Sequence, residues 1–181
     1  MFKGKLLISP KIVTDDIFFN RSVVIVVDHK KSGSLGFILN KKLNYTLNDI
    51  LDNVDISLPV YLGGPVDQDN LFFIHNCNEL IPNSIYIDYN LFWGGDFKMA
   101  ISLINNKTIN NKNICFYLGY TGWSSGQLDL EMKNNTWVLK DNSYKNKIIT
   151  KNKKSLWKDY MISFGGDNLI WANSPNNPYL N

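Results

Sequence analysis

The strongest constraint on the fold is the run of five branched aliphatic residues from Val23 to Val27. β-Branched side chains lose rotamer freedom in a helix and pack well on a pleated sheet, so this run predicts a strand. An uninterrupted apolar run, unlike an alternating one, is typical of a strand that is buried on both faces. We therefore expect the segment 21–27 to lie centrally in a sheet.

The remaining apolar residues predict short strands with hairpin-like spacers, and helices that come singly. Further strands are expected at 4–9, 35–39, 59–62, 71–74, 84–87, 115–118 and 136–139. Helices are expected at 47–51, where Thr46 can cap the first turn, and at 97–104, 124–132 and 155–164. The segments 28–34 and 67–70 are expected to be a loop and a turn, and the tail after Gly166 to be irregular. Because strands and helices do not alternate strictly, the predicted class is α+β.

Length and composition favour one compact domain, residues 1–181. A chain of 181 residues that is 44% hydrophobic can build a sizeable core. No segment approaches the roughly 20 apolar residues that a membrane helix needs. The apolar run 6–8 ends at Pro10, too early for a signal peptide, so we expect a cytoplasmic protein with no membrane partner. Cys77 and Cys115 are expected to be buried small hydrophobes, because two cysteines make neither a disulfide framework nor a zinc cluster.

The charge pattern argues against a dedicated nucleic-acid binder. The formal net charge is only +3, and no helix-turn-helix pair or basic recognition helix is evident. We therefore expect no sequence-specific nucleic-acid binding. The lysine-rich stretch 140–158 is interpreted as a solvated face, with an anionic partner as the alternative.

The densest group of special residues is the segment 116–131. An apolar run of strand length is followed by Gly119, Gly122 and Gly126, which predict a tight turn, and Ser124 with Gln127 fits a capping box at the start of a helix. The backbone N–H groups of such a helix start can bind an anion. The alternative is a structural strand-to-helix corner in which Trp123 serves as packing. The first hypothesis requires Trp123 to be partly accessible, and the second requires it to be buried.

Three segments of the chain resemble the AlgH/YqgE family of bacterial proteins, in the family's order and over nearly the whole length. They are Gly119-Tyr-Thr-Gly-Trp123 with Gly126-Gln-Leu-Asp129, Phe19-Asn-Arg-Ser-Val-Val24 with Asp28-His29 and Gly36-Phe-Ile-Leu-Asn40, and Tyr61-Leu-Gly-Gly-Pro-Val66 with Leu71-Phe-Phe-Ile-His75. The resemblance implies a strongly bent, mainly antiparallel sheet, curled towards a barrel and flanked by helices. It implies no established reaction. The regulator label carried by some members implies a role in transcription without a chemical basis.

Several residue types at predicted strand ends could carry a site. Arg21 needs a partner such as a carboxylate or a ligand phosphate, and Asn40 could hold a pocket wall through the backbone. His29 and His75 are the only histidines, and their spacing does not demand a metal site, so no metal or cofactor is expected. The full set of candidate ligand-binding residues is Arg21, Ser22, Asn40, Gly63, Gly64, His75, Tyr120, Gly122, Trp123, Gly126 and Gln127. We expect them to converge on one groove.

The leading functional hypothesis is a cytoplasmic binding or regulatory protein for a small anionic ligand or a protein partner, without an assigned catalytic residue. A second hypothesis is an enzyme that acts on a phosphate- or carboxylate-bearing small molecule, with His75 or His29 as acid and base. A third, a DNA-binding transcriptional regulator, is disfavoured by the missing recognition helix.

Overall fold

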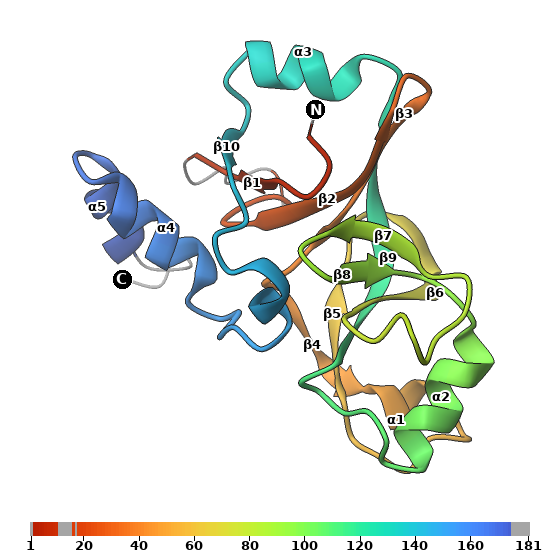
Figure 1. Ribbon diagram of the computed structural model, residues 1–181. Coiled ribbons are helices and arrows are strands. Elements are labelled where there is room, and N and C mark those ends of the chain that lie inside the picture. Colours follow the sequence, from red (N-terminus) through yellow and green to blue (C-terminus); the bar gives the residue numbers. More distant parts are fainter. Residues whose placement is uncertain (1, 11–15, 17, 175–181) are drawn as a thin grey trace.

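In the part of the chain that the structure describes, ten strands form one strongly curled, mostly antiparallel sheet, and five α-helices lie outside it (Figure 1). The computed structural model describes residues 2–10, 16 and 18–174. Along the main path the strands are β10 (Val138–Lys140), β1 (Leu6–Ile8), β2 (Val23–Lys30), β3 (Gly33–Ile38), β9 (Ile114–Ser124), β6 (Val66–His75), β8 (Leu91–Trp93) and β7 (Ile85–Asp88). Off this path, β4 (Lys42–Thr46) pairs with β5 (Pro59–Leu62), which pairs in parallel with β9. The predicted α+β class and the curled antiparallel sheet are confirmed.

The prediction of a central, doubly buried strand is confirmed by β2. It pairs with β1 on one side and β3 on the other, and Val23 to Val27 are all 0% exposed. Val23, Ile25 and Val27 pack in one core cluster, while Val24 and Val26 pack in another on the opposite face. The continuous apolar run is thus explained by two cores that share one strand.

The helices cover different parts of this sheet (Figure 1). They are α1 (Leu47–Ile50), α2 (Phe97–Asn105), α3 (Gln127–Lys133), α4 (Leu156–Phe164) and α5 (Asn168–Asn173), with a 3-10 helix η1 at Lys145–Ile149. The helices α1 and α2 lie together at one end of the sheet, and α4 and α5 lie together beside β1 and β10 (Figure 1). Local capping explains two helix starts: the Asp96 carboxylate accepts the Met99 N–H at 2.9 Å, and the Asp49 carboxylate accepts the Thr46 N–H at 2.7 Å.

Several boundaries differ from the sequence-based predictions. The predicted glycine turn after 118 is wrong, because β9 continues to Ser124 with backbone pairing to β3 and β6. The predicted turn 67–70 is likewise strand, within β6. The predicted loop 28–34 shrinks to a tight hairpin, since β2 ends at Lys30 and β3 begins at Gly33. In β9 and in the hairpin, partner strands satisfy backbone groups that sequence propensity alone assigns to a turn, whereas residues 67–70 form a bulge, because the pairing of β6 with β9 shifts between Val66 and Leu71.

Four elements were not predicted. The strand β4 is short and only weakly apolar, β8 is apolar but only three residues long, η1 is a short 3-10 helix, and α5 lies in the tail that was expected to be irregular. The predicted helix 155–164 corresponds to α4 and ends at Gly165, whose φ of 67° suits glycine. The part of the tail from 175 to 181 lies outside the described residues.

Candidate functional site

The structure does not bring the predicted site residues to one groove: five of the eleven line two separate cavities, and the other six line neither of them. Arg21 and Asn40 line a large cavity of about 1160 Å³ beside α4 and α5, which we call the basic cavity. Tyr120, Gly122 and Trp123 line a smaller cleft of about 460 Å³ at the β2–β3 hairpin. The prediction that these residues converge on one groove is therefore wrong.

Asn40 builds one wall of the basic cavity by holding the chain that precedes β2. Its side-chain oxygen accepts the Val23 N–H at 2.8 Å, and its side-chain amide donates to the Arg21 carbonyl at 2.8 Å. The residue between them, Ser22, is fully buried, and its N–H donates to the Ser9 hydroxyl at 2.9 Å. Ser22 therefore has a structural position outside the cavity lining, whereas Asn40 fixes the backbone of a lining residue.

Arg21 is held in a left-handed backbone conformation, with φ of 53°. Its Nη2 donates to the Ser174 carbonyl at 2.9 Å, and the guanidinium lies 5.2 Å from the centre of the Trp157 ring. These contacts join the segment before β2 to α4 and to the C-terminal end of α5. The Arg21 side chain is partly buried, and this burial lowers its pKa.

Seven positively charged side chains line the basic cavity, and its described lining includes no carboxylate. They are Arg21, Lys41, Lys42, Lys151, Lys153, Lys154 and Lys158. Two acidic residues lie near the cavity without lining it. The Asp159 carboxylate lies 3.5 Å from Lys151 Nζ. Burial lowers the pKa of Lys41, and the charge of Asp16 partly offsets that lowering. A concave wall that carries charges of one sign focuses its field into the cavity and concentrates anions there.

Lys153 is the most deeply placed of these cations, only 5% exposed. Its Nζ donates to the Ile149 carbonyl at 2.8 Å and contacts the Cys115 Sγ at 3.2 Å. It also lies 5.0 Å from the centre of the Tyr61 ring. Burial next to these groups raises the pKa of Tyr61 to about 12, so the phenol is neutral at physiological pH. Lys153 thus adds a positive charge to the wall of the cavity, and Tyr61 adds a neutral hydroxyl.

The smaller cleft is a structural corner more than an open site. Trp123 is 6% exposed, and its indole N–H donates to the Glu131 carboxylate at 2.8 Å. The buried position agrees with the corner hypothesis. Gly126 is the N-cap of α3 with φ of 73°, and the Gln127 side chain accepts the Ser124 N–H at 3.0 Å. The predicted pairing of Ser124 with Gln127 is therefore present, but the N-cap of the helix is Gly126, two residues later than the predicted cap.

Gly63 and Gly64 are explained by close packing of the chain against β9. A Cβ at Gly63 would lie 2.1 Å from the Gly119 carbonyl oxygen, and one at Gly64 would lie 2.3 Å from the Tyr120 backbone. The Gly63 N–H donates to the Leu118 carbonyl at 2.8 Å. These glycines are buried, and their place in the structure is a backbone contact between strands.

His75 is fully buried at the end of β6, which β9 separates from β3 in the sheet. Its Nε2 contacts the Gly94 carbonyl at 3.1 Å, and its Nδ1 accepts the Cys77 N–H at 3.3 Å. These contacts fit one neutral tautomer, and burial lowers the pKa of the ring. His75 lines neither cavity and holds local structure.

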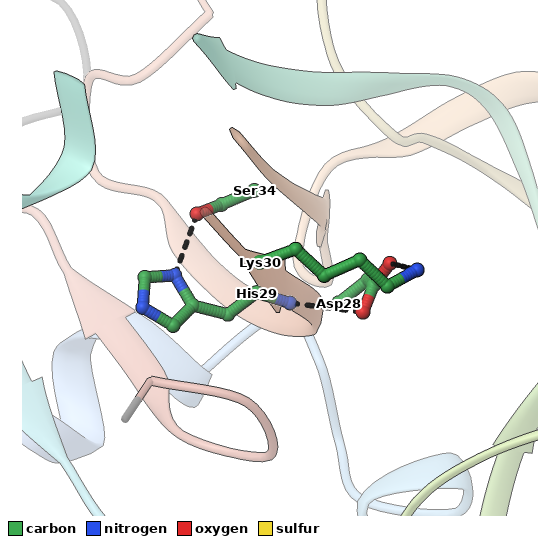
Figure 2. A network of polar contacts seen from close by, with 4 residues as sticks. All are labelled: Asp28, His29, Lys30 and Ser34. Carbon is green, nitrogen blue, oxygen red and sulfur yellow. Dashed lines mark hydrogen bonds and ion pairs between the residues drawn. The ribbon is translucent and has the colours of Figure 1, made fainter. Parts of the chain in front are cut away.

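His29 lies in the β2–β3 hairpin, where Figure 2 shows its ring pointing to Ser34 and away from the Asp28–Lys30 pair. Its Nδ1 lies 2.8 Å from the Ser34 hydroxyl, and Asp28 accepts only the backbone N–H of His29, at 3.0 Å. Asp28 instead pairs with Lys30 Nζ at 2.6 Å (Figure 2). The three groups therefore do not form a serine–histidine–aspartate relay. In the described part of the chain, no three histidine, cysteine or acidic residues cluster as metal ligands.

Sequence reasoning missed that the lysines of 151–158 meet Lys41, Lys42 and Arg21. The lysine-rich stretch was visible, but it was interpreted as a solvated face. Only the pairing of β4 with β5 and the packing of α4 place segments more than 100 residues apart around one cavity. Among the described residues, no helix is long and apolar enough to cross a membrane.

Comparison with known proteins gives consistent matches over the full length. The family model described as AlgH-like matches residues 6–169. A UPF0301 protein of Cytophaga hutchinsonii is 38% identical over 99% of this chain and 98% of its own length. A UPF0301 protein of Parabacteroides distasonis is 37% identical over 99% of this chain and 91% of its own length.

Two solved structures share the fold. The AlgH protein from Pseudomonas aeruginosa superposes with a TM-score of 0.72 at 21% identity, covering 97% of this chain and 95% of that one. A protein from Corynebacterium diphtheriae gives 0.71 at 17% identity, covering 96% and 93%.

Proposed function

This chain belongs to the AlgH-like family, and because that membership brings no reaction with it, we propose from the basic cavity that the protein binds a small molecule with several negative charges. The observation that carries the proposal is the set of seven cationic side chains on a lining that, in the described residues, holds no carboxylate. For a chain whose net charge is only +3, this is a strong local concentration. Ligands with adjacent phosphate or carboxylate groups suit it best, since such a ligand can contact several of the cations at once.

We further propose that the protein acts in the cytoplasm as a binding or regulatory protein and not as an enzyme. Two free cysteines support a reducing compartment. The positions of His29 and His75 support a binding role, since neither lines the basic cavity and the acid–base hypothesis depended on them. The bound anion would contact both Arg21, which precedes β2, and Lys158 of α4, so it would stabilise the contact between these two segments.

The test is calorimetric titration with inorganic triphosphate, citrate and sulfate at constant ionic strength. Lys154 and Lys158 are exposed lining residues, so Lys154→Gln/Lys158→Gln should leave the fold intact. We expect this pair to weaken triphosphate binding by about tenfold, which corresponds to about 1.4 kcal/mol. Lys98 and Lys112 are exposed and outside the cavity lining, so Lys98→Gln/Lys112→Gln removes the same charge elsewhere.

The matched control should change triphosphate affinity by less than about twofold, since exposed charges beyond a Debye length are screened. Equal losses in both double variants would show diffuse attraction to a basic protein and would overturn the cavity as the site. Absence of binding by all three anions to the wild-type protein would overturn the proposed function itself.

A further inference from the structure

A cysteine and a lysine from distant parts of the chain meet beneath the basic cavity. Cys115 lies on β9, and Lys153 lies between η1 and α4, 38 residues later. The distance between Lys153 Nζ and Cys115 Sγ is 3.2 Å. Reacting atoms held about 3 to 3.5 Å apart are in a near-attack arrangement.

One carbonyl group positions both side chains. The Ile149 oxygen accepts Lys153 Nζ at 2.8 Å and Cys115 Sγ at 3.6 Å. Lys153 Nζ also reaches the Ile148 carbonyl at 3.4 Å. Cys115 is 6% exposed and Lys153 is 5% exposed, so neither side chain is free to swing into solvent. The pair is therefore fixed in contact, and the Lys153 side chain connects it to the cavity that it lines.

We propose that Cys115 and Lys153 form a reversible covalent cross-link under oxidation by hydrogen peroxide. In the first step the thiol attacks one peroxide oxygen, giving sulfenic acid at Cys115 and releasing one water. The sulfur loses two electrons, and the peroxide gains them. A cation 3.2 Å from the sulfur lies where it can stabilise the negative charge that builds on the departing peroxide oxygen as the S–O bond forms.

In the second step Lys153 Nζ loses one proton to solvent and its nitrogen attacks the sulfur. An S–N bond forms, the S–O bond breaks, and the hydroxide takes a second proton from the nitrogen and leaves as water. This step transfers no electrons to an outside group, so one peroxide suffices for the whole reaction. The product is a sulfenamide, the side-chain counterpart of the bond that sulfenic acids form with backbone nitrogen. An excess of a small thiol would reverse the cross-link by exchange at the sulfur.

The cross-link would also turn the buried ammonium into a neutral nitrogen. The cavity would lose one of its seven cations, so oxidation would weaken anion binding. This consequence rests on the proposed function, whereas the cross-link itself does not.

The experiment uses the full chain, treated with hydrogen peroxide, then with a thiol-blocking alkylating agent, and analysed by intact and peptide mass spectrometry. Cys77→Ser is the background, because a disulfide between the two cysteines would show the same mass change. We expect the loss of two hydrogen atoms, a peptide pair joined through Cys115 and Lys153, and recovery of the original mass with dithiothreitol. Lys153→Arg should abolish the product, and Lys154→Arg, an exposed neighbour, should retain it.

Oxidation of Cys115 only to sulfenic or sulfinic acid in the Cys77→Ser protein would overturn the proposal, as would a cross-link that survives Lys153→Arg. The peptide assignment in the Cys77→Ser protein decides the matter even if Lys153→Arg fails to fold. A cross-link without any anion affinity would refute the proposed function alone. Anion affinity without a cross-link would refute this inference alone.

Discussion

The hydrogen bonds of the Glu131 carboxylate should make a measurable contribution to the free energy of unfolding by joining α3 to the sheet. Its Oε2 accepts the indole N–H groups of Trp123 and Trp137, each at 2.8 Å, and its Oε1 accepts the Gln127 side-chain amide at 3.0 Å. We call this arrangement the Glu131 clamp. It joins β9, α3 and the segment before β10 through one side chain.

The magnitude follows from the two indole bonds. A hydrogen bond to a charged group contributes about 1.5 to 3 kcal/mol, and both tryptophans are only 6% exposed, so water replaces the lost acceptor poorly. Allowing for partial rehydration, we expect Glu131→Ala to lower the free energy of unfolding by about 3 kcal/mol. Trp123→Phe removes one bond and some packing, and should lower it by about 2 kcal/mol.

A double-mutant cycle isolates the bond itself. Because Glu131→Ala already removes the acceptor, adding Trp123→Phe should cost less than it does alone, with a coupling energy of about 1 kcal/mol or more. The assay is urea unfolding followed by far-UV circular dichroism, since tryptophan fluorescence changes with the substitution. Glu79, which is exposed, gives the control: Glu79→Ala should stay within about 0.5 kcal/mol of wild type. A coupling energy below about 0.3 kcal/mol would refute the clamp as a stabilising interaction.

Four further predictions follow from burial and charge. Val24→Asp places an unpaired charge in a fully buried strand and should abolish soluble folded protein, so a normal thermal melt would contradict the core assignment. Gly63→Ala would put a Cβ 2.1 Å from the Gly119 oxygen and should lower the melting temperature sharply, whereas an unchanged melt would contradict the strand contact. Burial lowers the pKa of His75 in the folded protein, so the unfolded chain takes up more protons below its ordinary pKa of about 6.5. The free energy of unfolding should therefore decline as pH falls below about 6.5, and His75→Gln should flatten that slope; equal slopes would contradict the assignment. Finally, a labelled duplex and its scrambled counterpart should bind equally weakly at physiological salt, and a clear preference for one would overturn the expectation of no sequence-specific DNA binding.

Local features of the sequence were sufficient for the elements whose neighbours in the chain decide their structure. The run Val23–Val27 could be placed as a doubly buried strand because branched aliphatic residues on both faces leave no solvent-facing side. The start of α2 could be placed because Asp96 caps the third N–H that follows it. The three family segments likewise stand in the sequence itself, so the family and its curled antiparallel sheet could be predicted before any coordinates.

Only the tertiary structure decided the backbone conformation of the glycine-rich segment and the neighbours of the lysines. The glycines of 119–122 favour a turn by their conformational freedom, but pairing with β3 and β6 keeps this segment in β9. The burial of Trp123 depends on Glu131 and Trp137, which reach it through the packing of α3. The spacing of charged residues along the sequence does not indicate which distant residues, more than 100 positions away, lie beside them in the fold. Arg21, Lys41 and Lys153 line one cavity only because the curled sheet and α4 bring their segments together. The free energy of core packing drives that arrangement, and the lysines do not.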